Sequence, residues 1–363
     1  MSRILIAGGG TAGHVVPALA IADVLTDRGH TVEFCGAGHG MEGRLVPEAG
    51  YRFHRVRIRG FERHLGLGTI KTLASIPLAG VEAWNVLREV RPDCVVGVGA
   101  YASGPVVAEA AVRRIPSVAV EMDAHLGWTN RVLSRLVDKV CLSFPIPGCE
   151  GGKFVYTGRP LRPKLLSATR ADGRRRFGVE GEEPVLLIFG GSLGARLLND
   201  AVIEAFAGTT PAFQILHVTG EADYQRVVEA MLPSTERYQA FAYISDFHLA
   251  LAAADVALSR AGGSVAELLA AGVPAVLVPY PFATADHQMK NARALEAGGA
   301  AAVVPNAELT GPRLRAELER MLDPAVRARM SEAALALARP DATERIVAEI
   351  MKLTDRRRSA LRA

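Results

Sequence analysis

The sequence predicts an α/β fold of two Rossmann-like domains, each a doubly wound parallel sheet, that face a central cleft. Three observations lead to this prediction. Continuous apolar runs such as RILIAGG and VLLIFGG are separated by helical patterns, which is typical of parallel sheets covered on both faces. A glycine-rich turn follows the first strand of each half, as in α/β proteins that bring backbone close to a ligand. The chain has 363 residues, which is long for one ordinary core.

The chain is predicted to divide near residue 162. In the first half, strands are expected at RILIAGG, TVEFCGA, CVVGVGA, SVAVEM and VDKVCLSF. A stretch rich in Pro, Gly and Arg follows, from PIPGCEGGK to GRRRFG, and it predicts the linker. The pattern restarts with VLLIFGG, QILHVTG, YQAFAYI, DVALSRAGG, AVLVPYP and AAAVV. We therefore expect domains over residues 1–162 and 163–340, and a final helix over residues 341–363 that packs back on the N-terminal domain.

Composition and charge exclude several classes of protein. Lys and Arg total 42 against 38 acidic residues, and a formal charge of +4 is too mild to predict a nucleic-acid partner. The four cysteines lack metal-ligand spacing, so they are interpreted as buried reduced thiols of a cytoplasmic protein. The N-terminal stretch lacks the pattern of a signal peptide, and no apolar run of about 20 residues predicts a membrane span. We expect no metal and no cofactor.

The first glycine-rich turn has the spacing of a dinucleotide fingerprint. Gly8, Gly10 and Gly13 satisfy G-x-G-x-x-G between a strand and a helix, and Glu33 follows 20 residues after Gly13. A dinucleotide-binding oxidoreductase is therefore one interpretation, although a lone match of this kind is weak.

The residues inside that turn favour another interpretation. Thr11, Ala12, Gly13 and His14 place a hydroxyl and an imidazole at the start of the helix. These groups suit a reacting acceptor or a phosphate better than a bare dinucleotide turn does. The alternative is that His14 is only a polar residue at a helix N-terminus.

The second glycine-rich turn opens the second half. Gly190, Gly191, Ser192, Leu193 and Gly194 lie between a strand and a helix. Unpaired N–H groups and the helix dipole at such a turn favour a diphosphate, and the Ser192 hydroxyl adds a donor. A purely structural glycine turn is the alternative.

A third group of polar residues follows later strands of the second half. A small-residue turn over residues 261–264 precedes a helix that carries Glu267, a carboxylate suited to both ribose hydroxyls. The next strand leads to Asp286, His287 and Gln288. Ligands of α/β folds bind beyond the carboxyl ends of the strands. Individually, Asp286 or His287 is equally consistent with a solvated surface.

Five motifs in order resemble the MurG family of peptidoglycan N-acetylglucosaminyltransferases, which have the GT-B fold. They are GGGTAGHVVPALAIADVL, GAYASGP, GGSLGA, SRAGGSVAELLAAGVPAVLVPYP and ADHQMKNA, and they span essentially the whole chain. The resemblance implies transfer of GlcNAc from UDP-GlcNAc to the 4-hydroxyl of MurNAc-pentapeptide on undecaprenyl diphosphate, the conversion of lipid I to lipid II.

The resemblance also implies roles for individual residues. The N-terminal domain would bind the acceptor and the C-terminal domain the nucleotide sugar. Ile244 would meet the uracil, Glu267 the ribose and Gln288 the sugar hydroxyls. Ser192, with Gly191, Leu193 and Gly194, would face the diphosphate. The other implied donor contacts are Thr11, Ala12, Gly13, Asp123 and Arg162, and the acceptor diphosphate would meet Gly99, Tyr101, Ser103 and Gly104.

The chain departs from the family pattern at two positions of interest. Asp123, in the run VEMD, stands where the family has an asparagine, and Arg159, in GRPLRP, also replaces an asparagine. Four alternatives therefore remain open: a related GT-B transferase with another UDP-sugar or acceptor, a nucleotide-sugar 2-epimerase, the dinucleotide-binding protein, and a non-catalytic nucleotide-sugar sensor.

The chemistry expected is direct displacement at the anomeric carbon with inversion. The sequence has no D-x-D metal motif, so the leaving diphosphate would be stabilised by the glycine-turn amides and Arg162. The acceptor hydroxyl needs a base, for which His14 is the first candidate and Asp123 the second.

A basic stretch predicts a membrane-facing surface. Residues 52–64 read RFHRVRIRGFERH and are followed by the apolar segment LGLGTIKTLASIPLAGVEAW. Each basic residue near an anionic membrane contributes about 1 kcal/mol. We expect a cytoplasmic protein, peripheral on the inner face of the cell membrane; a core strand and helix with solvated arginines is the alternative.

Overall fold

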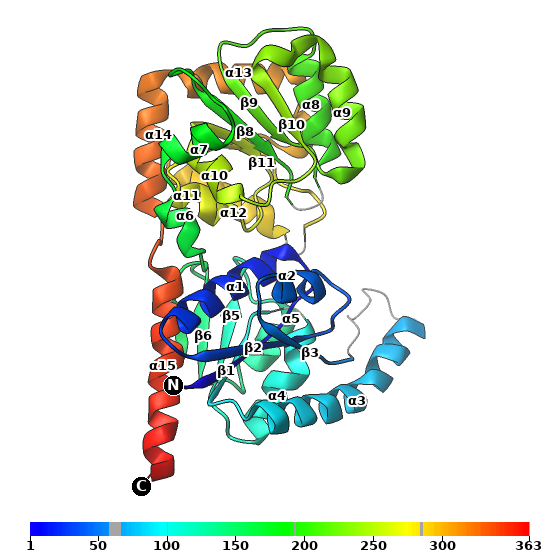
Figure 1. The fold of residues 1–363 in the computed structure, drawn as a ribbon, viewed down its shortest axis with the longest axis vertical. Coiled ribbons are helices and arrows are strands. Elements are labelled where there is room, and N and C mark those ends of the chain that lie inside the picture. The colour runs from blue at the N-terminus through cyan, green and yellow to red at the C-terminus, as the bar shows by residue number, and fades with distance from the viewer. Residues whose placement is uncertain (58–66, 100, 192–193, 284–285, 363) are drawn as a thin grey trace. The chain divides into compact units, whose positions relative to one another are not determined.

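The computed structural model describes residues 1–57, 67–99, 101–191, 194–283 and 286–362 (Figure 1). The chain divides into two compact units. Unit 1 comprises Met1–Arg162 together with Pro340–Ala363, and unit 2 comprises Pro163–Arg339. Each unit holds one parallel sheet between helices, so the predicted α/β fold with two doubly wound sheets is confirmed.

Unit 1 is built on a seven-stranded parallel sheet with the order β3-β2-β1-β4-β5-β6-β7. Its strands are β1 (Arg3–Ala7), β2 (Thr31–Gly36), β3 (Arg52–Arg55), β4 (Cys94–Gly97), β5 (Ser117–Glu121), β6 (Lys139–Leu142) and β7 (Phe154–Tyr156). Its helices are α1 (Ala12–Asp27), α2 (Glu42–Glu48), α3 (Leu67–Val90), α4 (Gly104–Val112), α5 (Trp128–Leu133) and α15 (Ala342–Arg362), with a 3₁₀ turn η1 (Tyr101–Ser103). The sequence pattern missed β7 and offered β3 only as the alternative for the basic stretch, because edge strands of three or four residues show too little periodicity.

Alternate residues of β1 point into two separate cores. Ile4 and Ile6 face α1 and α15, whereas Leu5 and Ala7 face α3 and α4. All four are fully buried, which explains why this strand reads as a continuous apolar run.

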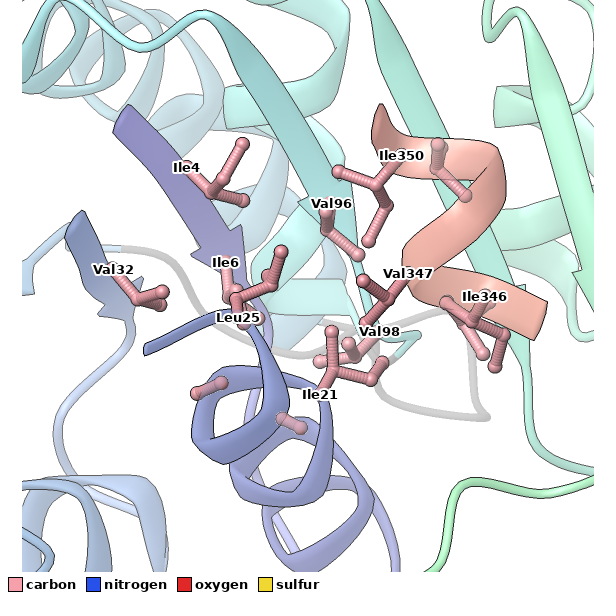
Figure 2. Packing of buried hydrophobic residues seen from close by; sticks show 14 of the residues in the cluster. Ile4, Ile6, Ile21, Leu25, Val32, Val96, Val98, Ile346, Val347 and Ile350 are labelled. Atoms are coloured by element: carbon pink, nitrogen blue, oxygen red, sulfur yellow. The ribbon is translucent and has the colours of Figure 1, made fainter. Parts of the chain in front are cut away.

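The last helix, α15, packs on the unit 1 sheet. Figure 2 shows its residues Ile346, Val347 and Ile350 close to Val96 and to Ile21 of α1. The three α15 side chains are fully buried. Burying an aliphatic side chain of this size contributes about 1.5–3 kcal/mol, so α15 is an integral part of this core.

Unit 2 has a six-stranded parallel sheet with the order β10-β9-β8-β11-β12-β13. The strands are β8 (Val185–Phe189), β9 (Gln214–Val218), β10 (Tyr238–Phe241), β11 (Val256–Ser259), β12 (Ala275–Leu277) and β13 (Ala301–Val303). Helices α8 (Arg196–Phe206), α9 (Tyr224–Met231), α13 (Gly311–Leu322) and α14 (Pro324–Leu337) share one core with the sheet. The remaining helices are α6 (Pro163–Ser167), α7 (Arg170–Arg176), α10 (Phe247–Ala253), α11 (Val265–Ala270) and α12 (His287–Ala297).

Strand order reverses once in each sheet, and the reversal locates the ligand-binding edge. In unit 1 it lies between β1 and β4, and in unit 2 between β8 and β11. Loops on either side of such a reversal separate and leave a crevice beyond the carboxyl ends of the strands. Both glycine-rich turns predicted from the sequence follow the first strand of these pairs.

No helix in the described part of the chain is long and apolar enough to cross a membrane.

Candidate active site

The first glycine-rich turn is held by a buried carboxylate that sequence reasoning missed. Glu42, at the start of α2 and 2% exposed, accepts hydrogen bonds from the backbone N–H groups of Gly10 (2.7 Å), Gly38 (3.0 Å) and Gly40 (3.4 Å). A side chain at Gly9 would place its Cβ 2.5 Å from the Glu42 carboxyl carbon. The turn therefore surrounds the Glu42 carboxylate, and the Gly10 N–H donates to that carboxylate rather than to a ligand.

Glu33 is engaged by the neighbouring strand. Its carboxylate lies 2.6 Å from His54 Nε2 and 3.7 Å from Arg52 Nε, both on β3. A dinucleotide protein would use the corresponding acidic residue for a ribose hydroxyl. Together with the internal bond from Glu42 to Gly10, these contacts speak against the dinucleotide interpretation.

His14 stands at the crevice of unit 1, where the loops after β1 and β4 meet. Its Nδ1 is 3.2 Å from the Thr11 hydroxyl, and its backbone N–H donates to the Thr11 carbonyl to begin α1. Gly99, with a φ of +81°, faces the ring: a Cβ there would lie 3.0 Å from His14 Cδ2. The structure thus brings together Thr11 and His14 of the first motif and Gly99 of the second.

Arg159 links the first turn to the end of β5. This guanidinium is 7% exposed and donates from Nη2 to the Gly13 carbonyl and from Nη1 to the Met122 carbonyl, 2.8 Å away. The Gly13 carbonyl would ordinarily accept from the N–H of the fourth residue along α1, but that residue is Pro17, which has none. Arg159 therefore supplies a donor that the helix itself lacks.

Asp123 is placed by the buried carboxylate of Glu121. Glu121 accepts from the Asp123 N–H (3.1 Å), the Gly127 N–H (2.9 Å) and Asn130 Nδ2 (2.9 Å). Burial raises the pKa of Glu121 above its ordinary value, although these donors favour the ionised form. The Arg159 bond to Met122 adjoins this loop, so the positions of Asp123 and the first turn are mechanically connected.

Tyr101, a predicted acceptor residue after β4, has a polar partner in the loop after β2. Its hydroxyl is 3.0 Å from His39 Nε2, and the two rings stack with centroids 6.5 Å apart. Burial raises the pKa of Tyr101, which therefore stays a neutral hydroxyl. Ser103 is fully buried at the end of η1, and Gly104 begins α4. His39 carried no sequence signal beyond its position between two glycines.

The second glycine-rich turn is tightly packed at Gly190 and Gly194, whereas a Cβ at Gly191 would meet nothing within 4 Å. Gly191 and Gly194 have φ values of +98° and +76°, which favour glycine. A Cβ at Gly190 would lie 2.3 Å from the Ala195 backbone nitrogen, and one at Gly194 would lie 2.2 Å from the Thr219 carbonyl oxygen. The predicted diphosphate contacts Ser192 and Leu193 lie outside the described residues.

The predicted nucleoside contacts follow neighbouring strands of unit 2. Ile244 is buried in the segment after β10, and Glu267 is half-buried in the first turn of α11, directly after β11. Both lie beyond the carboxyl ends of the strands, on the side where the second glycine-rich turn follows β8.

Gln288 is oriented by the loop after β12. Its Oε1 accepts from the Tyr280 N–H at 2.9 Å, and its Nε2 would lie 3.8 Å from a Cβ at Gly262. Arg260, which sequence reasoning did not single out as a site residue, donates to the carbonyls of Val278 (3.0 Å) and Pro279 (3.4 Å) and thereby fixes the same loop. Burial lowers the pKa of Arg260.

Arg162, a predicted donor contact, is paired inside unit 1. Its Nε and Nη2 lie 3.2 and 3.0 Å from Asp23 Oδ2 on α1, and the same aspartate accepts from the Tyr51 hydroxyl at 2.9 Å. To reach a phosphate, Arg162 would have to exchange Asp23 for the ligand. Within the described ranges, no group of three His, Cys, Asp or Glu side chains is arranged to hold a metal ion.

Comparison with known proteins assigns the chain to a family. Residues 4–142 match the glycosyltransferase family 28 N-terminal domain, and residues 185–346 match the glycosyltransferase family 28 C-terminal domain. The UDP-N-acetylglucosamine--N-acetylmuramyl-(pentapeptide) pyrophosphoryl-undecaprenol N-acetylglucosamine transferase of Desulfitobacterium hafniense (strain Y51) is 40% identical over 360 residues, 95% of this chain and 97% of the relative. The protein of the same name from Desulforamulus reducens is 37% identical over 369 residues, 98% of this chain and 99% of the relative.

A solved structure agrees with the sequence relatives. The crystal structure of Acinetobacter baumannii MurG superposes with a TM-score of 0.78 at 30% sequence identity, covering 97% of this chain and 100% of the other. Matches in both halves and along nearly the full length, in sequence and in fold, leave one assignment. The chain belongs to glycosyltransferase family 28 and, within it, to the MurG family of hexosyltransferases.

Proposed function

We propose that this protein transfers GlcNAc from UDP-GlcNAc to the 4-hydroxyl of MurNAc-pentapeptide carried on undecaprenyl diphosphate, with inversion at the anomeric carbon. The observation that carries the proposal is the full-length similarity to transferases whose names state this donor and this acceptor. The fold adds support, because each unit has a glycine-rich turn at its strand-order reversal, where doubly wound sheets bind their ligands.

Unit 1 is the proposed acceptor side, with His14 as the base. If Nδ1–H is donated to the Thr11 hydroxyl, the lone pair of His14 lies on Nε2, where it would take the proton of the attacking hydroxyl. The loop over residues 99–104 is the proposed seat of the acceptor diphosphate. Asp123, held by Glu121, is the second candidate for the base.

Unit 2 is the proposed donor side. Ile244 would contact the uracil, Glu267 the ribose, and Gln288 the sugar hydroxyls. The turn that contains Gly191, Ser192, Leu193 and Gly194 would hold the diphosphate with backbone N–H groups, which stabilise the charge that develops on the leaving group. The proposed donor contacts of Thr11, Ala12, Gly13, Asp123 and Arg162 complete the set.

A UDP-release assay across several UDP-sugars, with and without a synthetic lipid-linked MurNAc-pentapeptide, tests the function. We expect UDP release only when UDP-GlcNAc and this acceptor are both present. If UDP is released from UDP-GlcNAc with a different lipid or small molecule instead, that compound would replace MurNAc-pentapeptide as the proposed acceptor. Formation of the C2 epimer without any acceptor would replace transfer by epimerisation.

We also infer that the acceptor is reached at an anionic membrane surface contacted by α3 and α4. Leu78, Val81 and Trp84 project from α3 with 44%, 58% and 45% of their surface exposed, and Val112 at the end of α4 is 76% exposed. The Arg113 guanidinium lies 3.5 Å above the Trp84 ring. Exposed apolar side chains can insert at the boundary between headgroups and acyl chains, and neighbouring cations are attracted to anionic headgroups.

The basic stretch expected from the sequence contributes less to this surface than its composition suggests. Arg52 is paired with Glu89 of α3 at 2.5 Å, and Arg57 is paired with Glu82 at 2.5 Å. The part of the stretch over residues 58–66 lies outside the described residues. The cations near Trp84 come instead from Arg88, Arg91, Arg113 and Arg357, which line a hollow with it and with Asp93. Of these, Arg113 is paired with Glu109 at 2.9 Å.

Sedimentation with vesicles tests the membrane surface. The protein should sediment with vesicles that contain anionic phospholipid and remain in solution with neutral ones, and Trp84→Ala should weaken binding. Leu335→Ala, which removes an exposed apolar side chain from α14 of unit 2, is the matched control and should bind as the unmodified protein does. Equal binding to neutral and anionic vesicles would refute an electrostatic membrane surface.

A further inference from the structure

A continuous network of hydrogen bonds lies under the second glycine-rich turn and takes no direct part in the proposed chemistry. Asn199, on the first turn of α8, donates from Nδ2 to the Thr219 carbonyl (3.0 Å) and to Asp223 Oδ2 (2.8 Å). Its Oδ1 is 3.0 Å from His217 Nε2, and His217 Nδ1 is 2.8 Å from the Tyr238 hydroxyl. Asn199 and His217 are buried, at 2% and 0% exposure.

The bonding pattern fixes the direction of every hydrogen in this network. Both Nδ2 hydrogens of Asn199 are used, so Oδ1 can only accept and His217 must carry its proton on Nε2. His217 Nδ1 then accepts from the Tyr238 hydroxyl. Burial lowers the pKa of His217 to about 3, so the ring stays neutral and this single arrangement holds at physiological pH.

The Thr219 carbonyl connects this network to the glycine-rich turn. A Cβ at Gly194 would lie 2.2 Å from that oxygen and 3.0 Å from Gly220 Cα, so the backbone of the turn rests directly on the corner after β9. The same corner is tied to β10, because the Thr219 N–H donates to the Phe241 carbonyl at 2.9 Å. A displacement of the Thr219 backbone would therefore displace Gly194, which packs against it.

We propose that Asn199 is a positioning residue for the diphosphate turn. It binds α8, whose N-terminus follows the turn, to the Thr219 corner on which Gly194 rests, and so fixes the turn from both sides. The inference rests on the proposed function, in which this turn holds the diphosphate of a UDP-sugar. Asn199 lies behind the turn and would act through its backbone rather than on the ligand.

A residue that only stabilises the core would behave differently from a positioning residue. Loss of general stability weakens the binding of every ligand in proportion to the folded fraction. Loss of turn geometry weakens binding of the diphosphate while leaving contacts to uracil and ribose in place. The ratio of the dissociation constants of uridine and UDP therefore separates the two roles, and protein stability alone does not move it.

The experiment is calorimetric titration of UDP and of uridine into the whole protein and into Asn199→Ala. We expect UDP affinity to fall at least about tenfold, the equivalent of about 1.4 kcal/mol, and uridine affinity to change less than about twofold. Asn199→Ser is the second variant: it keeps a small uncharged polar group on α8 but is too short to replace the bond to Thr219, and it should show the same selective loss if the alanine variant does not fold.

The control is Arg174→Leu. Arg174 is buried in unit 2 and donates to the carbonyls of Glu183 (3.1 Å) and Gly181 (2.6 Å). These residues precede β8, so they lie at the amino end of the strand whose carboxyl end carries the glycine-rich turn. This variant should melt at a lower temperature with an unchanged ratio. Equal loss of UDP and uridine affinity in the Asn199 variants would overturn the inference and leave the proposed function intact. An unmodified protein that binds no UDP would overturn both.

Discussion

The guanidinium of Arg159 donates a hydrogen bond to the carbonyl oxygen of Gly13, 146 residues earlier in the chain. That carbonyl lacks its usual helical partner because position 17 is proline. Gly13 itself is exposed, so water could replace this donor, and the hydrogen bond contributes about 1 kcal/mol of stability. Since the same guanidinium also holds the Met122 carbonyl, Arg159 sets the distance between the loops that carry His14 and Asp123.

Replacing Arg159 by methionine should lower kcat more than it changes the KM for the donor. The variant keeps the apolar length of the side chain but removes both donors, so the His14 turn and the Asp123 loop lose their common anchor. A misplaced base slows the chemical step but does not weaken binding of the donor, so we expect kcat to fall about 10–100-fold. Steady-state kinetics with varied UDP-sugar and fixed acceptor measures the two effects.

Pro17→Ala in the Arg159→Met background is the companion experiment. Alanine supplies the N–H that Gly13 lacks within α1, so the double variant should regain about 1–2 kcal/mol of unfolding free energy over Arg159→Met. Pro17→Ala alone should gain much less. If the proline replacement has the same effect in both backgrounds, Arg159 does not act by satisfying the Gly13 carbonyl.

Glu42→Gln should loosen the first glycine-rich turn. The amide keeps one acceptor oxygen and presents an NH₂ group to N–H donors, so at least one of the bonds from Gly10, Gly38 and Gly40 is lost. We expect a loss of about 1–3 kcal/mol in unfolding free energy, and a higher KM for the acceptor. Glu48→Gln, at the exposed end of the same helix, should leave both values unchanged.

His14→Ala should abolish most of the chemical step while sparing donor binding. General-base catalysis of this kind contributes about 10²–10⁴-fold, so kcat should fall within that range. UDP binding should be unaltered. Full kcat in the variant would move the base to Asp123, where replacement by asparagine would then be strongly inhibitory instead of nearly neutral. His30→Gln, at the opposite edge of the sheet next to Ser2, serves as the control.

The buried His217 should make unit 2 lose stability in acid. Its pKa is lowered to about 3 in the folded protein against about 6.5 when exposed, so the unfolded chain takes up a proton that the folded one refuses. This contribution to stability is complete above pH 6.5 and falls by about 1.4 kcal/mol per pH unit below it. Urea unfolding of unit 2 between pH 7.5 and 5 should show a shallower acid slope in His217→Gln. Parallel slopes in the two proteins would contradict the prediction.

The sequence predicted the elements whose signals are local. The turns after β1 and β8 were visible because strand, glycines and helix follow one another within about 20 residues. His14, Glu267 and Gln288 were singled out as candidates because they follow β1, β11 and β12 directly or after a short loop.

The groups that hold these turns could not be predicted, because their partners are distant in the chain. Glu42 bonds Gly10 from 32 residues away, and Arg159 bonds Gly13 from 146 residues away. Arg159 was noticed only as a departure from a family pattern, and its consequence depends on Pro17 in a helix it does not adjoin in sequence. The network of Asn199 and His217 gave no signal, since buried polar residues within apolar elements have no periodicity of their own.

Because α15 completes unit 1, the synthesis of unit 1 begins before that of unit 2 and ends after it. Unit 2 is a single uninterrupted stretch, Pro163–Arg339, and it is translated in full before the last segment of unit 1. Until residues 340–363 emerge, the side of the first sheet next to α1 exposes the apolar ground that Ile346, Val347 and Ile350 will cover. This core of unit 1 therefore stays accessible to chaperones and proteases until residues 340–363 have been made, so a premature stop before them would damage the unit made first.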